Sequence, residues 1–177
     1  YVGLTISVGA LTAGHKVIGV DLSDSVIAGL RDGKSHIEGI SDEQISQGVT
    51  SGNFEPVNSY HLVEGSDLVV IAVPTPLDSS GAPDLSLLNS ASTSLGTALK
   101  KPTLIINEST SYPGTLRDLI KPLIDKGSGL SHEYAVSPER VDPGNAKFGT
   151  RNTPRIVGGL SDVARDAAVA FYRTFCD

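Results

Sequence analysis

The sequence contains no methionine and no tryptophan, and cysteine occurs once, at Cys176. A single cysteine excludes an internal disulfide and a metal site built from several thiolates, and it fits the reducing conditions of a cytoplasm. Because methionine is missing even at position 1, we expect the translation start to lie upstream. We interpret Cys176, within F-Y-R-T-F-C-D at the end of an expected helix, as a small apolar residue rather than a nucleophile.

Long apolar runs and clusters of basic charge are also missing. The longest apolar runs, such as residues 68–73, are far shorter than the ~18 residues of a membrane span, and no signal-peptide pattern is present. We therefore expect a soluble protein with no membrane partner. Asp and Glu number 20 against 14 Lys and Arg, a net charge of -6, and the basic residues are scattered. Since nucleic-acid binding requires a basic surface, we expect no nucleic-acid partner.

Strand-like apolar segments alternate with helix-like patterns along the chain. Strands are expected at residues 16–21, 54–57, 68–73, 103–107, 134–137 and 155–157, and helices at 1–12, 24–33, 42–50, 85–99, 115–126 and 161–175. Within the helix at 115–126, Pro122 must introduce a kink or a division. This alternation predicts an α/β fold with a doubly wound, mainly parallel sheet and helices on both faces. With 177 residues, 39% of them hydrophobic, we expect one domain, or one domain plus the first piece of another.

The opening residues fit the end of a dinucleotide-binding motif. Tyr1-Val2-Gly3 matches the last three positions of G-x-G-x-x-G, where helix amide groups bind a pyrophosphate, so the first strand of a Rossmann-like sheet is expected upstream. Asp21 follows at close to the ~20-residue spacing of the acid that binds the ribose. A carboxylate there repels a 2′-phosphate and favours NAD over NADP. Alternatively, Gly3 is an ordinary helix-start glycine and Asp21 a solvated strand end.

Three polar segments follow three of the expected strands. They are Val73-Pro74-Thr75-Pro76, residues 108–114 (E-S-T-S-Y-P-G) and residues 137–145 (S-P-E-R-V-D-P-G-N). Parallel α/β sheets bind ligands beyond the carboxyl ends of their strands. The sequence therefore predicts one composite site at this edge.

The first two segments each carry hydroxyl groups in a restricted backbone. Pro74 and Pro76 remove two amide donors and hold Thr75 nearly fixed, although a plain strand-to-loop stop would use the same residues. Thr110 and Ser111 precede a helix, whose amino end suits a polar or anionic ligand. Helix capping alone also explains such hydroxyl groups.

The third segment places a Glu-Arg pair in a stiff loop between Pro138 and Pro143. Glu139 is a candidate general base or water-positioning group, and Arg140 a candidate ligand of phosphate or carboxylate. An exposed loop salt bridge is the alternative interpretation. No residue pattern indicates a metal site.

Five segments together resemble a known family. Y-V-G-L, K-V-I-G-V-D, V-P-T-P, E-S-T-x-Y-P-G-T and S-P-E-R-V-D-P-G-N are similar, in order and spacing, to the amino-terminal domain of the UDP-glucose/GDP-mannose dehydrogenase family, over residues 1–177. The last motif resembles the branch that acts on UDP-N-acetylhexosamines. The resemblance implies a cytoplasmic, NAD-dependent enzyme of polysaccharide biosynthesis. Such an enzyme oxidises the C6 hydroxyl of a UDP-sugar to a carboxylate with two NAD, through bound aldehyde and thioester stages, and forms a homodimer through a linking helix beyond this chain.

The resemblance also implies roles for individual residues. Cofactor binding falls to Tyr1, Val2 and Gly3 at the pyrophosphate, Asp21 at the adenosine ribose, Val73, Pro74, Thr75 and Thr110 toward the nicotinamide, and Arg140 beside cofactor and sugar. Thr110 and Glu139 are the catalytic candidates, with Glu139 organising water and substrate during thioester hydrolysis.

Some features depart from the family. Val26 stands where relatives often carry a basic residue, and the G-x-C-x-x-K-D cysteine motif and the linking-helix lysine and asparagine are absent. On its own, the chain is expected to bind cofactor weakly and to catalyse nothing. Two alternatives remain: another Rossmann oxidoreductase, such as a 3-hydroxyacid dehydrogenase relative, and a non-enzymatic nucleotide-binding module.

Overall fold

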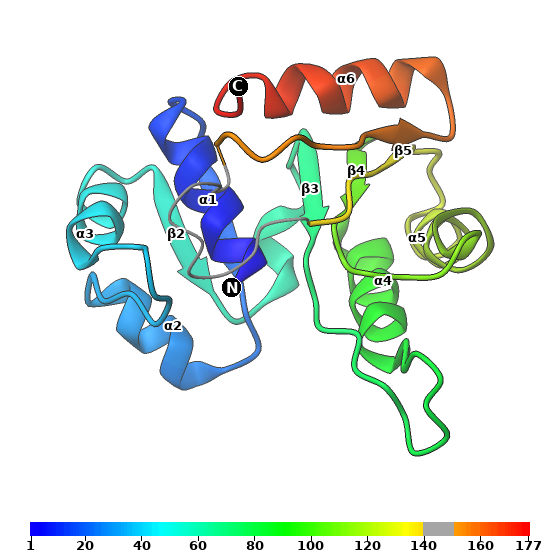
Figure 1. The fold of residues 1–177 in the computed structure, drawn as a ribbon, viewed down its shortest axis with the longest axis horizontal. Coiled ribbons are helices and arrows are strands. Elements are labelled where there is room, and N and C mark those ends of the chain that lie inside the picture. The colour runs from blue at the N-terminus through cyan, green and yellow to red at the C-terminus, as the bar shows by residue number, and fades with distance from the viewer. Residues whose placement is uncertain (140–150) are drawn as a thin grey trace. The chain divides into compact units, whose positions relative to one another are not determined.

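The computed structural model describes residues 1–139 and 151–177 and divides into two compact units (Figure 1). The first unit contains residues 1–60 together with 151–154 and 172–177, and the second unit contains residues 61–139 and 155–171. Each unit has its own sheet. None of the helices in these described ranges is long and apolar enough to cross a bilayer.

The first unit packs three helices around a two-stranded parallel sheet. Its elements are α1 (Val2–Thr12), β1 (Val17–Val20), α2 (Asp24–Arg31), α3 (Asp42–Thr50) and β2 (Phe54–Val57). The strands pair in register from Val17 opposite Phe54 to Val20 opposite Val57. Leu4, Leu30, Ile45 and Phe54 form the buried centre, because the helices and β2 each direct an apolar side chain inward.

Side chains cap the starts of two first-unit helices. Ser23 begins α2, where its side chain accepts a hydrogen bond from the backbone N–H of Val26. Ser41 and Gln44 form a reciprocal capping box at the start of α3. Both predicted helix starts are confirmed, since these caps depend only on residues three positions apart.

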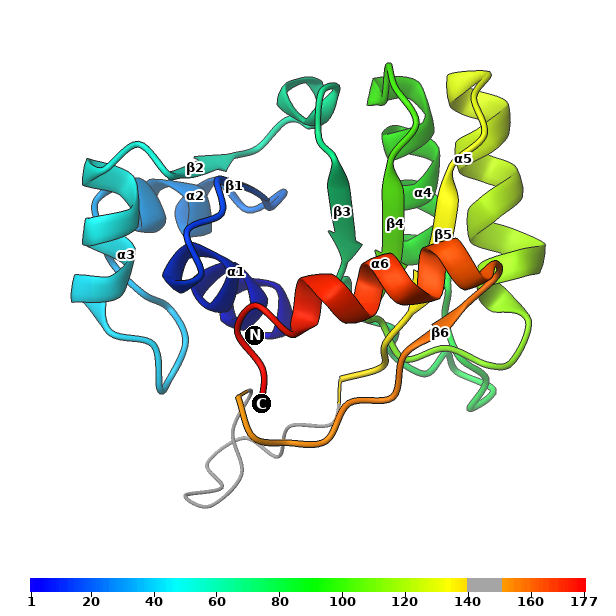
Figure 2. The same ribbon diagram turned by 90° about the horizontal axis from the view of Figure 1, so that it is seen from above.

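The second unit is built on a four-stranded sheet in the order β3-β4-β5-β6. Its strands are β3 (Leu68–Ile71), β4 (Leu104–Asn107), β5 (Glu133–Val136) and β6 (Gly158–Gly159). The first three are parallel, and β6 runs antiparallel to β5. Figures 1 and 2 show α4 (Ser86–Ala98) and α5 (Lys121–Ser128) on one face of this sheet and α6 (Asp162–Tyr172) on the other.

The expected break at Pro122 is present as a change of helix type. Residues Leu116–Ile120 form a π-helix, in which the N–H of Lys121 bonds to the carbonyl oxygen of Leu116, and α5 then begins at Lys121. In a continuous α-helix, the Pro122 ring would clash with the carbonyl group four residues earlier. The wider π turn avoids this clash.

Two elements differ from the expectation. A short 3-10 helix at Tyr60–Val63 was not predicted. The strand expected at 155–157 is wrong, because the residues that pair with β5 are the next two, Gly158 and Gly159. Glycine has low strand propensity, so the local pattern favours the apolar residues before it. Close packing explains the glycine, because a Cβ atom on Gly159 would lie 2.5 Å from the backbone nitrogen of Arg165.

Candidate active site

In the first unit, α1 begins with residues that carry no acidic side chain. Tyr1 is the N-cap residue, no side chain caps the helix, and the first turn contains no acidic residue. The N–H groups of a first helical turn have no partner within the helix. Within the described ranges, Tyr1, Val2 and Gly3 thus form a helix start suited to an anionic group such as a pyrophosphate.

Asp21 follows β1 at the carboxyl edge of the first-unit sheet. Its Oδ1 atom accepts a hydrogen bond of 2.8 Å from the N–H of Ser23, which turns the exposed carboxylate across the start of α2. Burial, and then the negative charge of Asp21, raise the pKa of Tyr60. The neighbouring Asp24 accepts a 2.8 Å hydrogen bond from the side chain of Asn58. Two carboxylates at this edge suit ribose hydroxyl groups and oppose an additional phosphate.

Val26 belongs to the core rather than to this edge. Its side chain is partly buried and packs against the cluster that contains Leu30 and Phe54. Val26 therefore offers no polar contact to a ligand.

In the second unit, the three polar segments follow strands whose ends are aligned. Ile71 lies opposite Asn107, and Asn107 lies opposite Val136, so β3, β4 and β5 end at one edge. Ser109 links two of these ends: its hydroxyl group accepts from the N–H of Val73 at 2.9 Å and donates to the Val73 carbonyl at 2.8 Å. The N–H of Ser137 donates to the Asn107 carbonyl at 3.0 Å.

The candidate residues of the second unit therefore belong to a single edge of the sheet. Thr75, Thr110 and Glu139 follow β3, β4 and β5 respectively; Thr110 is exposed, and the other two are partly buried. Val73 and Pro74 directly precede Thr75 in the chain. Tyr1, Val2, Gly3 and Asp21 lie in the first unit. Arg140 lies outside the described residues, and the chemical roles of all these residues stay predictions.

A buried ionic triad lies beneath this edge. Nη1 of Arg155 donates to Oε1 of Glu108, and Nη2 donates to Oε2 of Glu139, each at 3.1 Å. The side chains of Arg155, Glu108 and Glu139 are 8%, 0% and 12% exposed respectively. The guanidinium group thus joins the end of β4 to the loop that follows β5.

Sequence reasoning missed two members of this triad. Glu108 was included only as the first residue of a segment, and Arg155 only as the start of an expected strand. A weak signal was present, because both charged residues stand directly beside strand-like apolar segments, where charges are rarely buried without a partner.

Two buried polar side chains complete the floor of the edge. The amide group of Asn107 donates to the Ser109 carbonyl at 3.1 Å and approaches the Ser111 hydroxyl group at 3.4 Å. Asn107 Oδ1 and Ser137 Oγ are fully buried, and neither has a hydrogen-bond partner among the described residues. Buried polar atoms in native proteins usually bind water or ligand when no protein group serves them.

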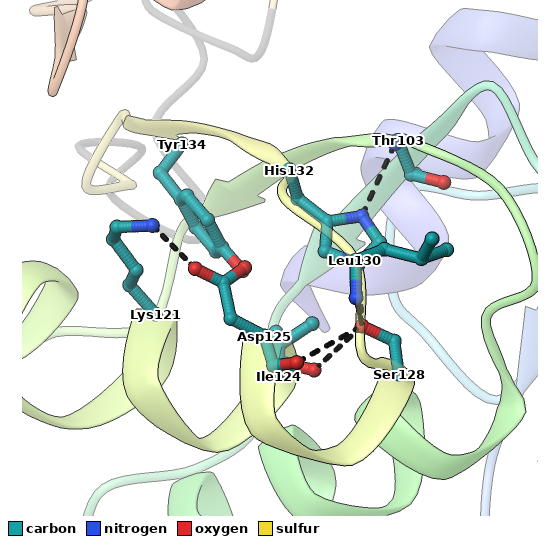
Figure 3. A network of polar contacts seen from close by, with 8 residues as sticks. All are labelled: Thr103, Lys121, Ile124, Asp125, Ser128, Leu130, His132 and Tyr134. Carbon is teal, nitrogen blue, oxygen red and sulfur yellow. Dashed lines mark hydrogen bonds and ion pairs between the residues drawn. The ribbon is translucent and has the colours of Figure 1, made fainter.

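A second polar network lies at the opposite edge of the same sheet (Figure 3). The imidazole of His132 accepts from the N–H of Thr103 through Nδ1 at 3.1 Å, and its Nε2 atom lies 2.9 Å from the Ser128 hydroxyl group. Tyr134 donates to Asp125 at 2.7 Å, and Asp125 also pairs with Lys121. Because Thr103 and His132 precede β4 and β5, this network stabilises the fold away from the candidate site.

Within the described ranges, no group of three or more His, Cys, Asp or Glu side chains could hold a metal ion.

Cys176 is partly buried near the end of the chain, where its N–H bonds to the carbonyl oxygen of Tyr172.

Two named dehydrogenases are similar in sequence to this chain. The chain is 32% identical to the UDP-N-acetyl-D-mannosamine dehydrogenase of Pyrococcus horikoshii, over 99% of this chain and 43% of that protein. It is 30% identical to the UDP-N-acetyl-D-glucosamine 6-dehydrogenase of Pseudomonas aeruginosa, over 98% of this chain and 41% of that protein. The chain thus spans less than half the length of these relatives.

Solved structures agree with the sequence comparison. The UDP-D-ManNAc dehydrogenase of Pyrococcus horikoshii matches with a TM-score of 0.92 and 31% identity, covering 100% of this chain and 43% of that chain. The expected Rossmann-like α/β fold and the expected family are both confirmed. Residues 1–176 match the family model described as UDP-glucose/GDP-mannose dehydrogenase family, NAD binding domain, so this chain belongs to that family.

Proposed function

We propose that this chain is the NAD-binding domain of a nucleotide-sugar 6-dehydrogenase. The complete enzyme oxidises the C6 hydroxyl group of UDP-N-acetyl-glucosamine or UDP-N-acetyl-mannosamine to a carboxylate. Two NAD molecules each accept a hydride, and one water molecule supplies the second carboxylate oxygen. The observation that carries the proposal is the family match over residues 1–176, together with relatives named for these two sugars at 30–32% identity.

The chemistry of the first-unit edge fits NAD. The uncapped start of α1 at Tyr1, Val2 and Gly3 suits the pyrophosphate, and the Asp21 carboxylate suits the hydroxyl groups of the adenosine ribose. Asp24 adds a second negative charge beside Asp21 that opposes the 2′-phosphate of NADP. When bound, NAD supplies the hydride acceptor, and the residues of this chain bind and orient it.

The second-unit edge supplies polar groups for the nicotinamide end of NAD and for the substrate. Ser109 bonds to the backbone of Val73, two residues before Thr75. Thr75 and Thr110 offer hydroxyl groups toward the nicotinamide. Glu139 has a carboxylate that can orient water for hydrolysis, and Arg140 adds a cation for the anionic substrate. Since the cysteine motif of the family is absent from this chain, covalent chemistry belongs to the complete protein.

The proposal is tested with the complete protein and three nucleotide sugars. UDP-N-acetyl-glucosamine, UDP-N-acetyl-mannosamine and UDP-glucose are supplied separately with NAD, and the absorbance of NADH is followed. We expect two NADH per sugar oxidised for one of the two N-acetylated sugars and slower turnover of UDP-glucose. Failure to form NADH with any nucleotide sugar would overturn the proposal.

The proposal extends to the setting of the complete enzyme. We expect a cytoplasmic homodimer that supplies uronic acid sugars for polysaccharide synthesis. Light scattering coupled to size-exclusion chromatography measures its mass directly, and a monomer at micromolar concentration would contradict the dimer.

A further inference from the structure

Arg155 occupies a position that pairing alone does not explain. Its side chain is 8% exposed, and its guanidinium group contacts two carboxylates that follow different strands. Burying charged groups costs several kcal/mol per ion, and well-packed apolar residues often give equal or greater stability. Stability is therefore a weak reason for the triad, and its geometry indicates another use.

The three side chains form a gradient from the interior to the edge of the sheet. Glu108, directly after β4, is 0% exposed, whereas Glu139 is 12% exposed at the rim. The backbone N–H of Glu108 donates to the Ile71 carbonyl at 2.8 Å, which fixes Glu108 to the end of β3. Glu108 thus anchors one side of the guanidinium group rigidly, while the other side holds a carboxylate that reaches the surface.

A planar guanidinium group is suited to holding one carboxylate in a fixed position relative to another. Its Nη1 and Nη2 atoms each bind one carboxylate at 3.1 Å, so the position of one carboxylate determines that of the other. The ammonium group of a lysine is a point charge on a flexible stem and lacks this fixed fork. The residue type therefore matches a positioning role.

We infer that Arg155 is a positioning residue that orients the Glu139 carboxylate at the carboxyl edge, with Glu108 as its buried anchor. The inference rests on the proposed function, in which Glu139 orients water during hydrolysis. A misplacement of about 1 Å in a reacting group can lower a rate by about 100-fold. Arg155 consequently acts on turnover rather than on cofactor binding.

The test is a double-mutant cycle in the complete enzyme. Arg155→Gln and Glu139→Gln are made singly and together, and kcat and the KM for NAD are measured with the preferred UDP-sugar. We expect Arg155→Gln to lower kcat about 10- to 100-fold with the KM for NAD changed less than about 2-fold. In the Glu139→Gln background, the same substitution should lower kcat less than about 3-fold, because its target is already removed.

Two further variants separate positioning from loss of folding. Arg155→Lys keeps the charge, so it should fold with a Tm near that of the wild type and recover part of kcat. Arg165→Gln removes an arginine that is 46% exposed on α6 and should leave kcat unchanged. If Arg155→Gln fails to fold, the test uses Arg155→Lys instead. A kcat of Arg155→Lys equal to that of the wild type would then overturn the inference.

The outcomes distinguish this inference from the proposed function. Equal losses of kcat for Arg155→Gln with and without Glu139 would overturn the positioning role, as would a loss expressed mainly in the KM for NAD. An active wild-type enzyme whose folded Arg155→Gln variant keeps full kcat would overturn the inference alone. A wild-type enzyme that forms no NADH would overturn both.

Discussion

At the scale of the single residue, we expect the Asp21 carboxylate to determine how the first-unit edge binds a nucleotide. It is exposed and already oriented by the N–H of Ser23, so little ordering remains when a ligand binds. The same charge opposes a 2′-phosphate. Cofactor choice is therefore expected to depend more on this side chain than on the neighbouring apolar Val26.

The substitution Asp21→Ala should weaken NAD binding specifically. Hydrogen bonds to a charged group contribute about 1.5–3 kcal/mol, so we expect the KM for NAD to rise at least ~10-fold, with kcat changed much less. Asp32→Ala, which removes an exposed carboxylate at the end of α2, is the matched control and should change neither parameter. Equal KM values for Asp21→Ala and the wild type would remove Asp21 from the cofactor site.

His132 is held in its neutral form by its hydrogen bonds (Figure 3). Because Nδ1 accepts from the N–H of Thr103, a proton on Nδ1 would face another donor, and burial lowers the pKa of His132. In the unfolded chain, the pKa returns to about 6.5. The unfolded state then binds more protons than the folded state below about pH 6.5. The contribution of neutral His132 to the free energy of unfolding is therefore complete above this pH and decreases as the pH falls.

The contribution of His132 is measured by denaturant unfolding at several pH values. Wild-type protein should lose up to about 1.4 kcal/mol per pH unit below about pH 6.5 relative to His132→Gln, which cannot titrate. The two proteins differ only at position 132, so the difference between their pH dependences isolates His132. Parallel pH dependences of the two proteins would contradict the proposed neutral state.

At the scale of the element, α4 and α5 approach closely because two glycines meet. A Cβ atom on Gly96 would lie 2.9 Å from the Leu123 carbonyl oxygen, and one on Gly127 would lie 2.9 Å from the Cα atom of Gly96. These neighbours are backbone atoms, which cannot rotate away as a flexible side chain would. The α4–α5 pair therefore requires glycine at this crossing.

Gly96→Ala should destabilise the second unit despite the better helix propensity of alanine. Propensity favours alanine by about 1 kcal/mol, but overpacking typically costs about 1–3 kcal/mol, and the helices must move apart. We expect a net loss of about 1–2 kcal/mol by urea unfolding. Gly65→Ala, at a site where a Cβ atom meets nothing within 4 Å, should change stability by less than about 0.5 kcal/mol. A stabilised Gly96→Ala variant would show that the crossing is looser than described.

The elements also mark where sequence reasoning succeeds and where it fails. The helix at Asp42–Thr50 and the strand at Phe54–Val57 were predicted with the observed bounds, because a capping box and a short apolar run are local signals. The pairing of Gly158 and Gly159 with β5 depends instead on packing beneath α6. The Arg155–Glu108 pair joins residues 47 positions apart, a separation at which no local pattern operates.

At the scale of the whole molecule, binding of NAD should appear as added stability. A ligand that binds only the folded state stabilises it by about 2.7 kcal/mol at 100 times its Kd, by mass action. The complete protein should therefore show a Tm that rises with NAD concentration. NADP at the same concentrations should raise the Tm much less, because the carboxylates of Asp21 and Asp24 oppose the additional phosphate.

The Asp21→Ala variant makes this measurement specific. Its Tm should respond less to NAD than that of the wild type, and the difference between NAD and NADP should shrink, because one of the two opposing charges is gone. Asp32→Ala should keep the wild-type responses to both cofactors. Equal stabilisation of the wild type by NAD and NADP would mean that the edge after β1 does not select between them, and the assignment of Asp21 to the adenosine ribose would then be wrong.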